Sequence, residues 1–158
     1  MNAQAGSNRS IRLLVVDHQP SVRRGLKMRL TLEEDLEVVG EAADVTEAIS
    51  LARALRPDVV LMDIATPGMS GGAATERLCA AAPQSAVVVF TLHDDAATRE
   101  QARAAGAAAF VAKHRTEEVL LAAIRGVAAT NAKPGRHDRL SSGAAEERRD
   151  DTRGHRDA

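Results

Sequence analysis

Large aromatic residues are nearly absent from this sequence. It contains no tryptophan, no tyrosine and only two phenylalanines in 158 residues, although apolar residues make up 44% of the chain. That apolar content is enough for a core, which must therefore be built from Val, Leu, Ile, Met and Ala. Such small aliphatic side chains suit helices that pack closely on a sheet.

Cysteine and long apolar runs are also scarce. The single cysteine, Cys79, cannot form a disulfide within the chain, which favours a reducing compartment, and we interpret it as a small buried apolar side chain. No apolar run approaches the ~20 residues that span a bilayer, and residues 1–10 lack the apolar middle of a signal peptide. We therefore expect a cytoplasmic protein without a membrane-spanning segment.

The chain has no excess of charge of either sign. Lys and Arg number 21 against 22 Asp and Glu, which leaves a formal net charge of −1 and no basic footprint for nucleic acid. Residues 130–158 carry mixed charges with Leu140 as their single large aliphatic residue, so we expect a disordered charged tail there and a disordered start over residues 1–9. The stretch between them, 10–129, is long enough for one domain with one core.

The chain does contain a regular alternation of apolar runs and helix-like stretches. Runs typical of buried strands are Ile11–Val16, Leu36–Gly40, Val59–Met62, Val87–Phe90 and Ala107–Ala112. The stretches of helical periodicity between and after them begin at Pro20, at Asp44 as a cap, near Ala73 after a turn-rich loop over 66–72, at Asp94 or Asp95, and at Thr116. This alternation predicts an α/β fold with parallel strands joined by crossover helices. Val59–Met62 contains no polar residue and is expected to be central in the sheet.

Four of the apolar runs end on a polar residue. These residues are Asp17, Asp63, Thr91 and Lys113. Because parallel strands place their carboxyl ends at one edge of the sheet, where ligands bind in open α/β folds, we expect the four side chains to converge there. Two carboxylates, a hydroxyl and an ammonium at one edge indicate a site for a cation and a phosphate.

Asp63 is the candidate nucleophile at this edge. A carboxylate can accept a phosphoryl group and become an acyl phosphate. That transfer needs a hard cation with oxygen ligands, a fixed positive side chain and a hydroxyl or amide donor, and Asp17, Lys113 and Thr91 are of the required types. A lone Asp after a strand is also typical of a helix cap or a turn, so the prediction depends on the whole set.

These segments, taken in order, resemble the receiver domain of bacterial response regulators of the NarL/FixJ type. The matching stretches are Leu13–Leu26, Pro57–Ile64, Pro67–Gly71, Thr91–Asp95 and Gly106–Lys113, and the resemblance covers about residues 10–129. It implies a doubly wound, flavodoxin-like fold with a five-stranded parallel sheet in the order 2-1-3-4-5 and five flanking helices. It also implies a signal-transduction module rather than an enzyme, with at most phosphorylation of itself from a phosphodonor and loss of that phosphoryl group.

The resemblance assigns a phosphoacceptor and a metal site. Asp63 would receive the phosphoryl group from a sensor histidine kinase or a phosphotransfer protein. Asp17 and Asp63 would hold Mg²⁺ together with the backbone carbonyl of Ala65.

The resemblance also assigns a switch and an output surface. Thr91 would bind a phosphoryl oxygen and Lys113 would pair with the phosphoryl group. Phe110 would be the aromatic residue whose rotamer follows Thr91, although a lone Phe is also typical of a core. The face formed by the helix over 96–105, the strand over 107–112 and the last helix would serve for output and for a homodimer contact.

The sequence departs from the family pattern at His18. The family usually has two adjacent acidic residues after the first strand, and here the pair is Asp17-His18. Imidazole is a poor ligand for Mg²⁺, so metal binding is expected to be weaker. Three outcomes remain open: phosphorylation with a weaker metal dependence, a pseudo-receiver that binds proteins independently of phosphorylation, or a preference for a softer ion such as Mn²⁺ or Zn²⁺.

Other departures concern the loop after Asp63 and the end of the chain. Ser70 and Gly72 replace an acidic and a larger apolar residue, and the adjacent glycines are expected to loosen the start of the following helix. Regulators of this type usually continue into a DNA-binding helix-turn-helix, but no second periodic segment follows Val127, so direct DNA binding by this chain is not expected. An unrelated small enzyme on the same fold is a rival without support, because the chain lacks a glycine-rich phosphate loop and a paired nucleophile and base.

Overall fold

The computed structural model of the chain describes residues 9–65 and 70–132, in which strands and helices alternate. Most of the two expected disordered ends, and residues 66–69 of the loop after Asp63, lie outside the described residues. The elements are β1 (Ile11–Val16), α1 (Pro20–Thr31), β2 (Leu36–Ala42), α2 (Val45–Leu55), β3 (Val59–Met62), α3 (Gly71–Ala81), β4 (Ala86–Thr91), α4 (Ala96–Ala104), β5 (Ala109–Ala112) and α5 (Glu117–Ala132).

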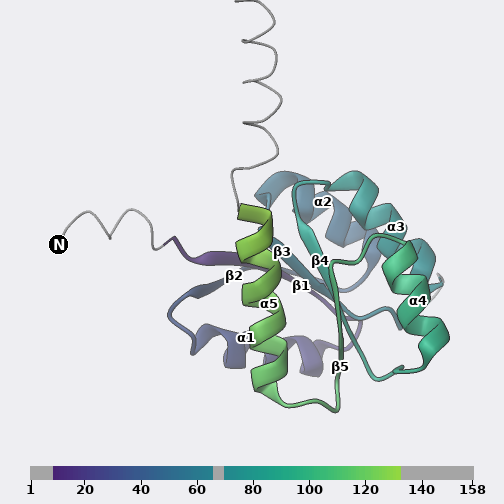
Figure 1. Cartoon of the computed structure of the whole chain (residues 1–158). Helices are drawn as coiled ribbons and strands as arrows, with labels where there is room; N and C mark the ends of the chain where they lie inside the picture. Colours follow the sequence, from purple (N-terminus) through teal and green to yellow (C-terminus); the bar gives the residue numbers. More distant parts are fainter. Residues whose placement is uncertain (1–8, 66–69, 133–158) are drawn as a thin grey trace, which may run out of the picture.

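The five strands form one parallel sheet in the order β2-β1-β3-β4-β5, with helices on both faces (Figure 1). This confirms the predicted α/β architecture and the predicted strand order. β3 lies in the middle of the sheet and all four of its residues are buried, as expected for a strand without polar residues.

Each face of the sheet carries its own apolar core because side chains alternate along a strand. Leu13 and Val15 of β1 face α1 and α5, where they pack with residues such as Ile124. Leu14 and Val16 face the other layer, formed by α2, α3 and α4. The alanines of that second layer include Ala48, Ala52, Ala74 and Ala102. The small side chains let the helices approach the sheet closely, as the composition predicts.

Local signals define the helix ends. Asp44 caps α2, because its carboxylate accepts a hydrogen bond from the backbone N–H of Glu47 at 2.8 Å. Asp95, and not Asp94, caps α4 by accepting from the N–H of Thr98 at 2.7 Å. α4 is followed by Gly106, whose φ of +109° suits a glycine at a helix end.

Several element bounds differ from the sequence prediction because tertiary pairing and capping override local pattern. β4 is one residue longer at each end than predicted, Ala86–Thr91 instead of Val87–Phe90. β2 runs two residues further, to Ala42, which pairs with Val16. β5 begins at Ala109 rather than Ala107, since its pairing with β4 starts there. α3 begins at Gly71, after the cap Ser70, and α5 continues to Ala132, so that the first residues of the expected tail are helical.

The sheet has two open edges, formed by β2 and β5. Leu13 of β1 pairs with Val38 of β2, but the next residue, Leu14, pairs with Gly40. Val39 is therefore an extra residue, which forms a β-bulge in β2. β5 is only four residues long.

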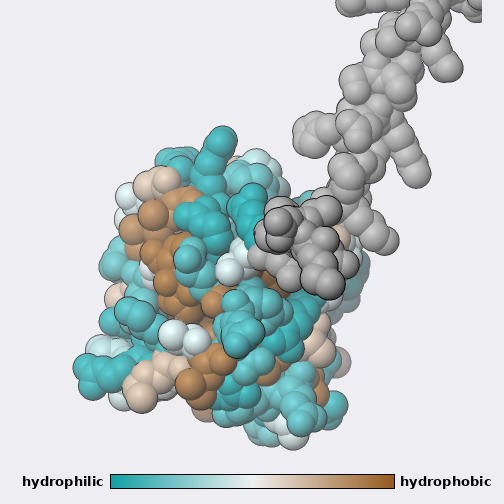
Figure 2. Space-filling view, turned by 90° about the vertical axis from the view of Figure 1, so that its left-hand side faces the viewer, coloured by the Kyte–Doolittle hydropathy of each residue, from teal (hydrophilic) through white to brown (hydrophobic). Residues whose placement is uncertain are grey.

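Apolar side chains reach the surface on the face shown in Figure 2 as strips between polar groups. The large apolar residues that are exposed in the described part of the chain are Met28, Leu32 and Leu92. Within residues 9–65 and 70–132, no helix combines the length and the hydropathy needed to traverse a bilayer.

Candidate functional site

The four predicted polar residues converge at the carboxyl edge of the sheet. Asp17 follows β1, Asp63 follows β3, Thr91 is the last residue of β4 and Lys113 follows β5. Backbone hydrogen bonds hold these strand ends in register: the N–H of Asp63 donates to the carbonyl of Val16 at 3.0 Å, and the N–H of Lys113 donates to the carbonyl of Thr91 at 2.7 Å. The predicted convergence is therefore present in the structure.

The centre of the site is one ammonium group shared by two carboxylates. Lys113 Nζ donates to Asp63 Oδ2 at 2.7 Å and to Asp17 Oδ2 at 2.9 Å. The Asp17 and Asp63 side chains are only 2% and 8% exposed, and that of Lys113 is 14% exposed. Because two carboxylates share one ammonium, the lysine only partly neutralises the negative charge of the site. Solvent screens this charge poorly because the three groups are largely buried.

Backbone amides bind the outer carboxylate oxygens. The N–H of Gln19 donates to Asp17 Oδ1 and the N–H of Ala65 donates to Asp63 Oδ1, both at 2.9 Å. Arg23 of α1 adds a hydrogen bond from Nη1 to the backbone carbonyl of Asp17 at 2.6 Å. The two carboxylates are therefore held in place from both sides.

The surroundings of Asp63 favour its ionised form. Burial by itself opposes ionisation of the carboxyl, but hydrogen bonds from the Lys113 ammonium, the Ala65 N–H and the Thr91 hydroxyl outweigh it, so the pKa of Asp63 lies below its usual value. Burial likewise opposes protonation of Lys113, and its two carboxylate partners raise its pKa nonetheless. Asp63 is thus an anion and Lys113 a cation at neutral pH.

Thr91 is fully buried beside Asp63. Its Oγ1 also accepts a hydrogen bond from the backbone N–H of His93 at 3.3 Å. The hydroxyl therefore connects the carboxylate to the loop that follows β4.

His18 lies next to the site but contributes no oxygen ligand. Its Nδ1 is 3.9 Å from Asp17 Oδ1 and is buried without a hydrogen-bond partner among the described residues. The described residues contain no group of three or more His, Cys, Asp or Glu side chains that could hold a metal ion. A cation at this edge would therefore depend on Asp17, Asp63, backbone oxygen such as the Ala65 carbonyl, and water. Those donors fit Mg²⁺, which commonly uses one or two carboxylates and keeps several waters.

Phe110 lies on β5, where it packs against the layer of α2, α3 and α4. The guanidinium carbon of Arg99 is 5.0 Å from the centre of its ring, a cation–π contact. Arg99 also forms an ion pair with Asp94, in the loop after β4. These contacts connect Phe110 to the loop that follows Thr91.

Sequence reasoning missed the roles of Arg23, Asp94 and Arg99. No pattern around Arg23 in the sequence indicates that its side chain reaches the backbone of Asp17. Asp94 and Arg99 are five residues apart, which is not a spacing that predicts a pair along a helix. Only the three-dimensional arrangement shows these contacts.

Comparison with known proteins gives consistent results. Residues 13–125 match the family model described as response regulator receiver domain. The chain is 40% identical to the response regulator GacA of Pseudomonas aeruginosa over 117 residues, which are 74% of this chain and 55% of GacA. It is 33% identical to the transcriptional regulatory protein DegU of Brevibacillus brevis over 128 residues, 81% of this chain and 54% of DegU. The chain thus spans about half the length of the curated relatives it matches.

Solved structures show the same likeness. One is the signal receiver domain of the response regulator NarL from Mycobacterium tuberculosis, with a TM-score of 0.66, 33% identity and coverage of 75% of this chain and 98% of that one. Another is a two-component response regulator of the LuxR family from Aurantimonas, with a TM-score of 0.73, 33% identity and coverage of 88% and 98%.

Proposed function

The chain belongs to the response regulator receiver domain family, and from this premise we propose that it accepts a phosphoryl group on Asp63 and thereby changes its affinity for a partner. The observation that carries the proposal is the shared ammonium of Lys113 between Asp17 and Asp63 at the carboxyl edge of the sheet. A phosphoryl group on Asp63 would bring new anionic oxygens to the ammonium of Lys113, which is already in place.

The proposed step is a phosphoryl transfer from a phosphohistidine of a sensor histidine kinase or a phosphotransfer protein. A carboxylate oxygen of Asp63 forms a bond to phosphorus, and the bond between phosphorus and the imidazole nitrogen breaks. The electron pair of that bond stays on the imidazole. Because Asp63 is already ionised, no base is needed to remove a proton from it.

The residues around Asp63 would bind the phosphoryl group and the metal ion. Lys113 offers its ammonium to the anionic oxygens of the phosphoryl group, and the Thr91 hydroxyl and the Ala65 N–H are neutral donors that already bond to the acceptor carboxylate. Receiver domains generally bind Mg²⁺. In this chain, Asp17, Asp63 and the Ala65 carbonyl would hold the ion, and its charge would offset the repulsion between the carboxylates and the incoming phosphoryl group.

The switch is proposed to be a population shift between two states of the loop after β4 and of the surface next to it. Thr91 leads into that loop, and Asp94 connects it through Arg99 to the ring of Phe110. Movement of Thr91 toward a phosphoryl oxygen would therefore reach the face of α4, β5 and α5. We propose that this face contacts the output partner or a second copy of the chain.

The working domain is proposed to span about residues 10–129, in the cytoplasm, where a kinase can phosphorylate it. Receiver domains are generally signalling modules without enzymatic turnover. We propose that any activity of this one is limited to taking a phosphoryl group from a donor and losing it again. Direct DNA binding is not part of the proposal, because the domain carries no basic footprint.

The test is phosphorylation by a small donor. The purified protein, Asp63→Asn and the control Asp44→Asn are incubated with acetyl phosphate and Mg²⁺, and each is weighed by intact-protein mass spectrometry. Asp44 caps α2 at the surface, and Asn is an equally good cap, so the control makes the same chemical change without affecting the site. One phosphoryl group is expected on the native chain and on Asp44→Asn. A native chain that gains no mass, while a known receiver does, would contradict the proposal.

A second function is favoured by His18. Because His18 supplies no carboxylate and Lys113 already pairs with both carboxylates, the site can remain in one state without a metal. The domain would then be a phosphorylation-independent binding module. In that case the native chain gains no phosphoryl group in the same experiment, whereas His18→Asp does.

A further inference from the structure

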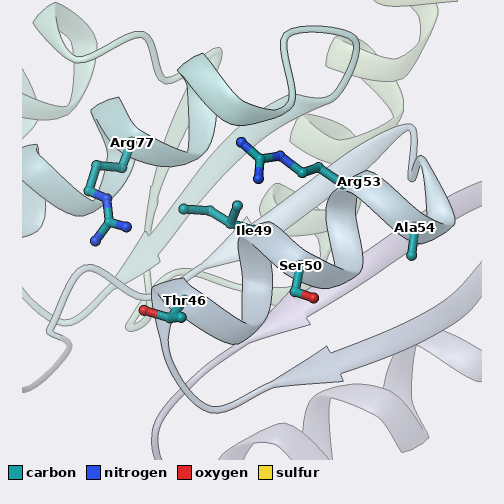
Figure 3. A pocket seen from close by; sticks show the side chains of 6 residues that line it. All are labelled: Thr46, Ile49, Ser50, Arg53, Ala54 and Arg77. Atoms are coloured by element: carbon teal, nitrogen blue, oxygen red, sulfur yellow. The ribbon is translucent and has the colours of Figure 1, made fainter.

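A groove between α2 and α3 holds two arginine side chains outside the phosphoacceptor site. It has a volume of about 600 Å³ and is lined by Thr46, Ile49, Ser50, Arg53, Ala54 and Arg77. Figure 3 shows Ile49 between the two arginines, with Arg53 extending from α2 toward α3. None of these residues belongs to the site around Asp63.

The two guanidinium groups have no carboxylate partner within the described residues. On a helix, a carboxylate partner would lie three or four residues before or after each arginine. Around Arg53 these four positions hold Ile, Ser, Arg and Pro, and around Arg77 all four hold Ala. Arg29 and Arg103, in contrast, pair with Glu33 and Glu100, which lie four and three residues away in the chain. The lining of the groove also contains no acidic residue.

The chemistry of the lining specifies an occupant. Two guanidinium groups are suited to carboxylates, which they can bind with paired hydrogen bonds. Ile49 and Ala54 provide an apolar surface, and the hydroxyls of Thr46 and Ser50 can bond to a peptide backbone. The groove is too open to bury most of a small ligand, and two cations are too few to follow a nucleic-acid backbone.

We propose that the groove between α2 and α3 docks an acidic peptide segment of a partner protein, with carboxylates at Arg53 and Arg77 and an aliphatic side chain over Ile49. This surface is separate from the proposed phosphoryl switch, so it goes beyond that function and stands independently of it. Recognition by two exposed arginines predicts a moderate affinity that decreases as salt is added.

The test measures the binding of a designed probe by fluorescence anisotropy. The probe is a fluorescein-labelled peptide with the pattern Glu-Leu-Glu-Glu-Leu-Glu, and the matched peptide carries Lys in place of Glu. The full chain is expected to bind the acidic peptide and not the basic one. Amide chemical-shift changes in the native protein are expected to fall on α2 and α3, which tests the location without any substitution.

Charge-reversal variants test the two arginines. Arg53→Glu with Arg77→Glu is expected to weaken binding at least about tenfold, because two attractive contacts become repulsive. The control, Arg24→Glu with Arg115→Glu, makes the same change in net charge at two exposed arginines whose side chains also have no carboxylate partner in the described part of the chain. It is expected to change the affinity by less than about twofold.

Three outcomes would overturn the proposal. The acidic peptide could fail to bind, the control could weaken binding as much as the test variant, or inorganic phosphate at equal concentration could displace the probe completely. The last result would mean that the groove binds simple anions rather than a peptide. Circular dichroism of each variant establishes that a lost signal comes from the groove and not from unfolding.

Discussion

Asp17 and Asp63 accept hydrogen bonds from the same ammonium group, although they are 46 positions apart in the chain. Each carboxylate also accepts a backbone N–H on its other oxygen. The ends of β1 and β3 are therefore connected through one lysine at the end of β5. The same three side chains that hold this edge of the sheet together are the ones to which we assign the proposed phosphoryl transfer.

Removal of the shared cation is expected to destabilise the fold. Lys113→Met leaves two nearly buried carboxylates without an ammonium partner, so we expect the free energy of unfolding at neutral pH to fall by about 1–3 kcal/mol. The free energy of unfolding is measured by chemical denaturation followed by circular dichroism. Lys27→Met, which removes a half-exposed lysine 3.3 Å from Glu41, is the control and is expected to change stability by less than about 1 kcal/mol.

The same variant has a predicted pH dependence. The folded-state pKa of Asp63 lies below its unfolded value of 3.8, so its contribution to stability is present above about pH 4 and is lost as the pH falls through the folded pKa. The difference in the free energy of unfolding between the native protein and Lys113→Met should therefore be largest near neutral pH and smaller at about pH 3.5. An equal difference in the free energy of unfolding at both pH values would show that the variant is destabilised by the loss of packing and not by the loss of charge.

Restoration of an acidic residue beside Asp17 is expected to strengthen metal binding. His18→Asp adds a hard oxygen ligand, and we expect the Mg²⁺ concentration for half-maximal phosphorylation to fall by about tenfold, equal to ~1.4 kcal/mol. His93→Asp, at the exposed loop after β4, is the matched control. Thermal unfolding supplies a second readout, because His18→Asp should gain more stability from added Mg²⁺ than the native chain does. Equal responses from both substitutions would show that added charge alone is responsible.

The two glycines at the start of α3 are expected to respond in opposite directions to alanine. A Cβ on Gly71 would lie 2.8 Å from Cβ of Ile64, next to Asp63, whereas a Cβ on Gly72 meets nothing closer than 3.9 Å. Gly71→Ala should therefore destabilise the domain by about 1–3 kcal/mol, and Gly72→Ala should stabilise it by up to about 1 kcal/mol. Thermal unfolding compares them. Equal effects would contradict the close approach at Gly71.

Arg56 is the non-glycine residue with a positive φ, 50°, in the described part of the chain, at the end of α2. Glycine adopts this conformation without the steric penalty of a side chain, so Arg56→Gly should stabilise the domain by about 0.5–1 kcal/mol. Ala54→Gly, two residues earlier in the helix, should destabilise it by about 1 kcal/mol. If both substitutions destabilise the domain, contacts of the Arg56 side chain matter more than its backbone conformation.

Hydrophobic patterning predicts most of this fold because each strand and helix buries a continuous apolar face. Val59–Met62 is recognisable as a central strand from its four apolar residues alone, and the cap at Asp44 from its local pattern. The last two residues of β2 were not predictable from local pattern, because they belong to the strand only through their pairing with β1.

The candidate site is predictable to the extent that it follows strand ends. Asp17, Asp63 and Lys113 meet because parallel strands end at one edge. The contact of Arg99 with Phe110 joins α4 to β5, and no periodicity along the chain encodes it. The closeness of Gly71 to Ile64 is likewise a property of packing, which explains why the adjacent glycines look alike in sequence and differ in the structure.

The bulge at Val39 affects how copies of this domain can meet. A regular, extended edge strand offers its free backbone groups to a strand of another molecule, which leads to aggregation. Here the register shift at Val39 interrupts the ladder of β2, and β5 at the opposite edge is only four residues long. Continuation of the sheet from one molecule into the next is therefore disfavoured at both of its edges.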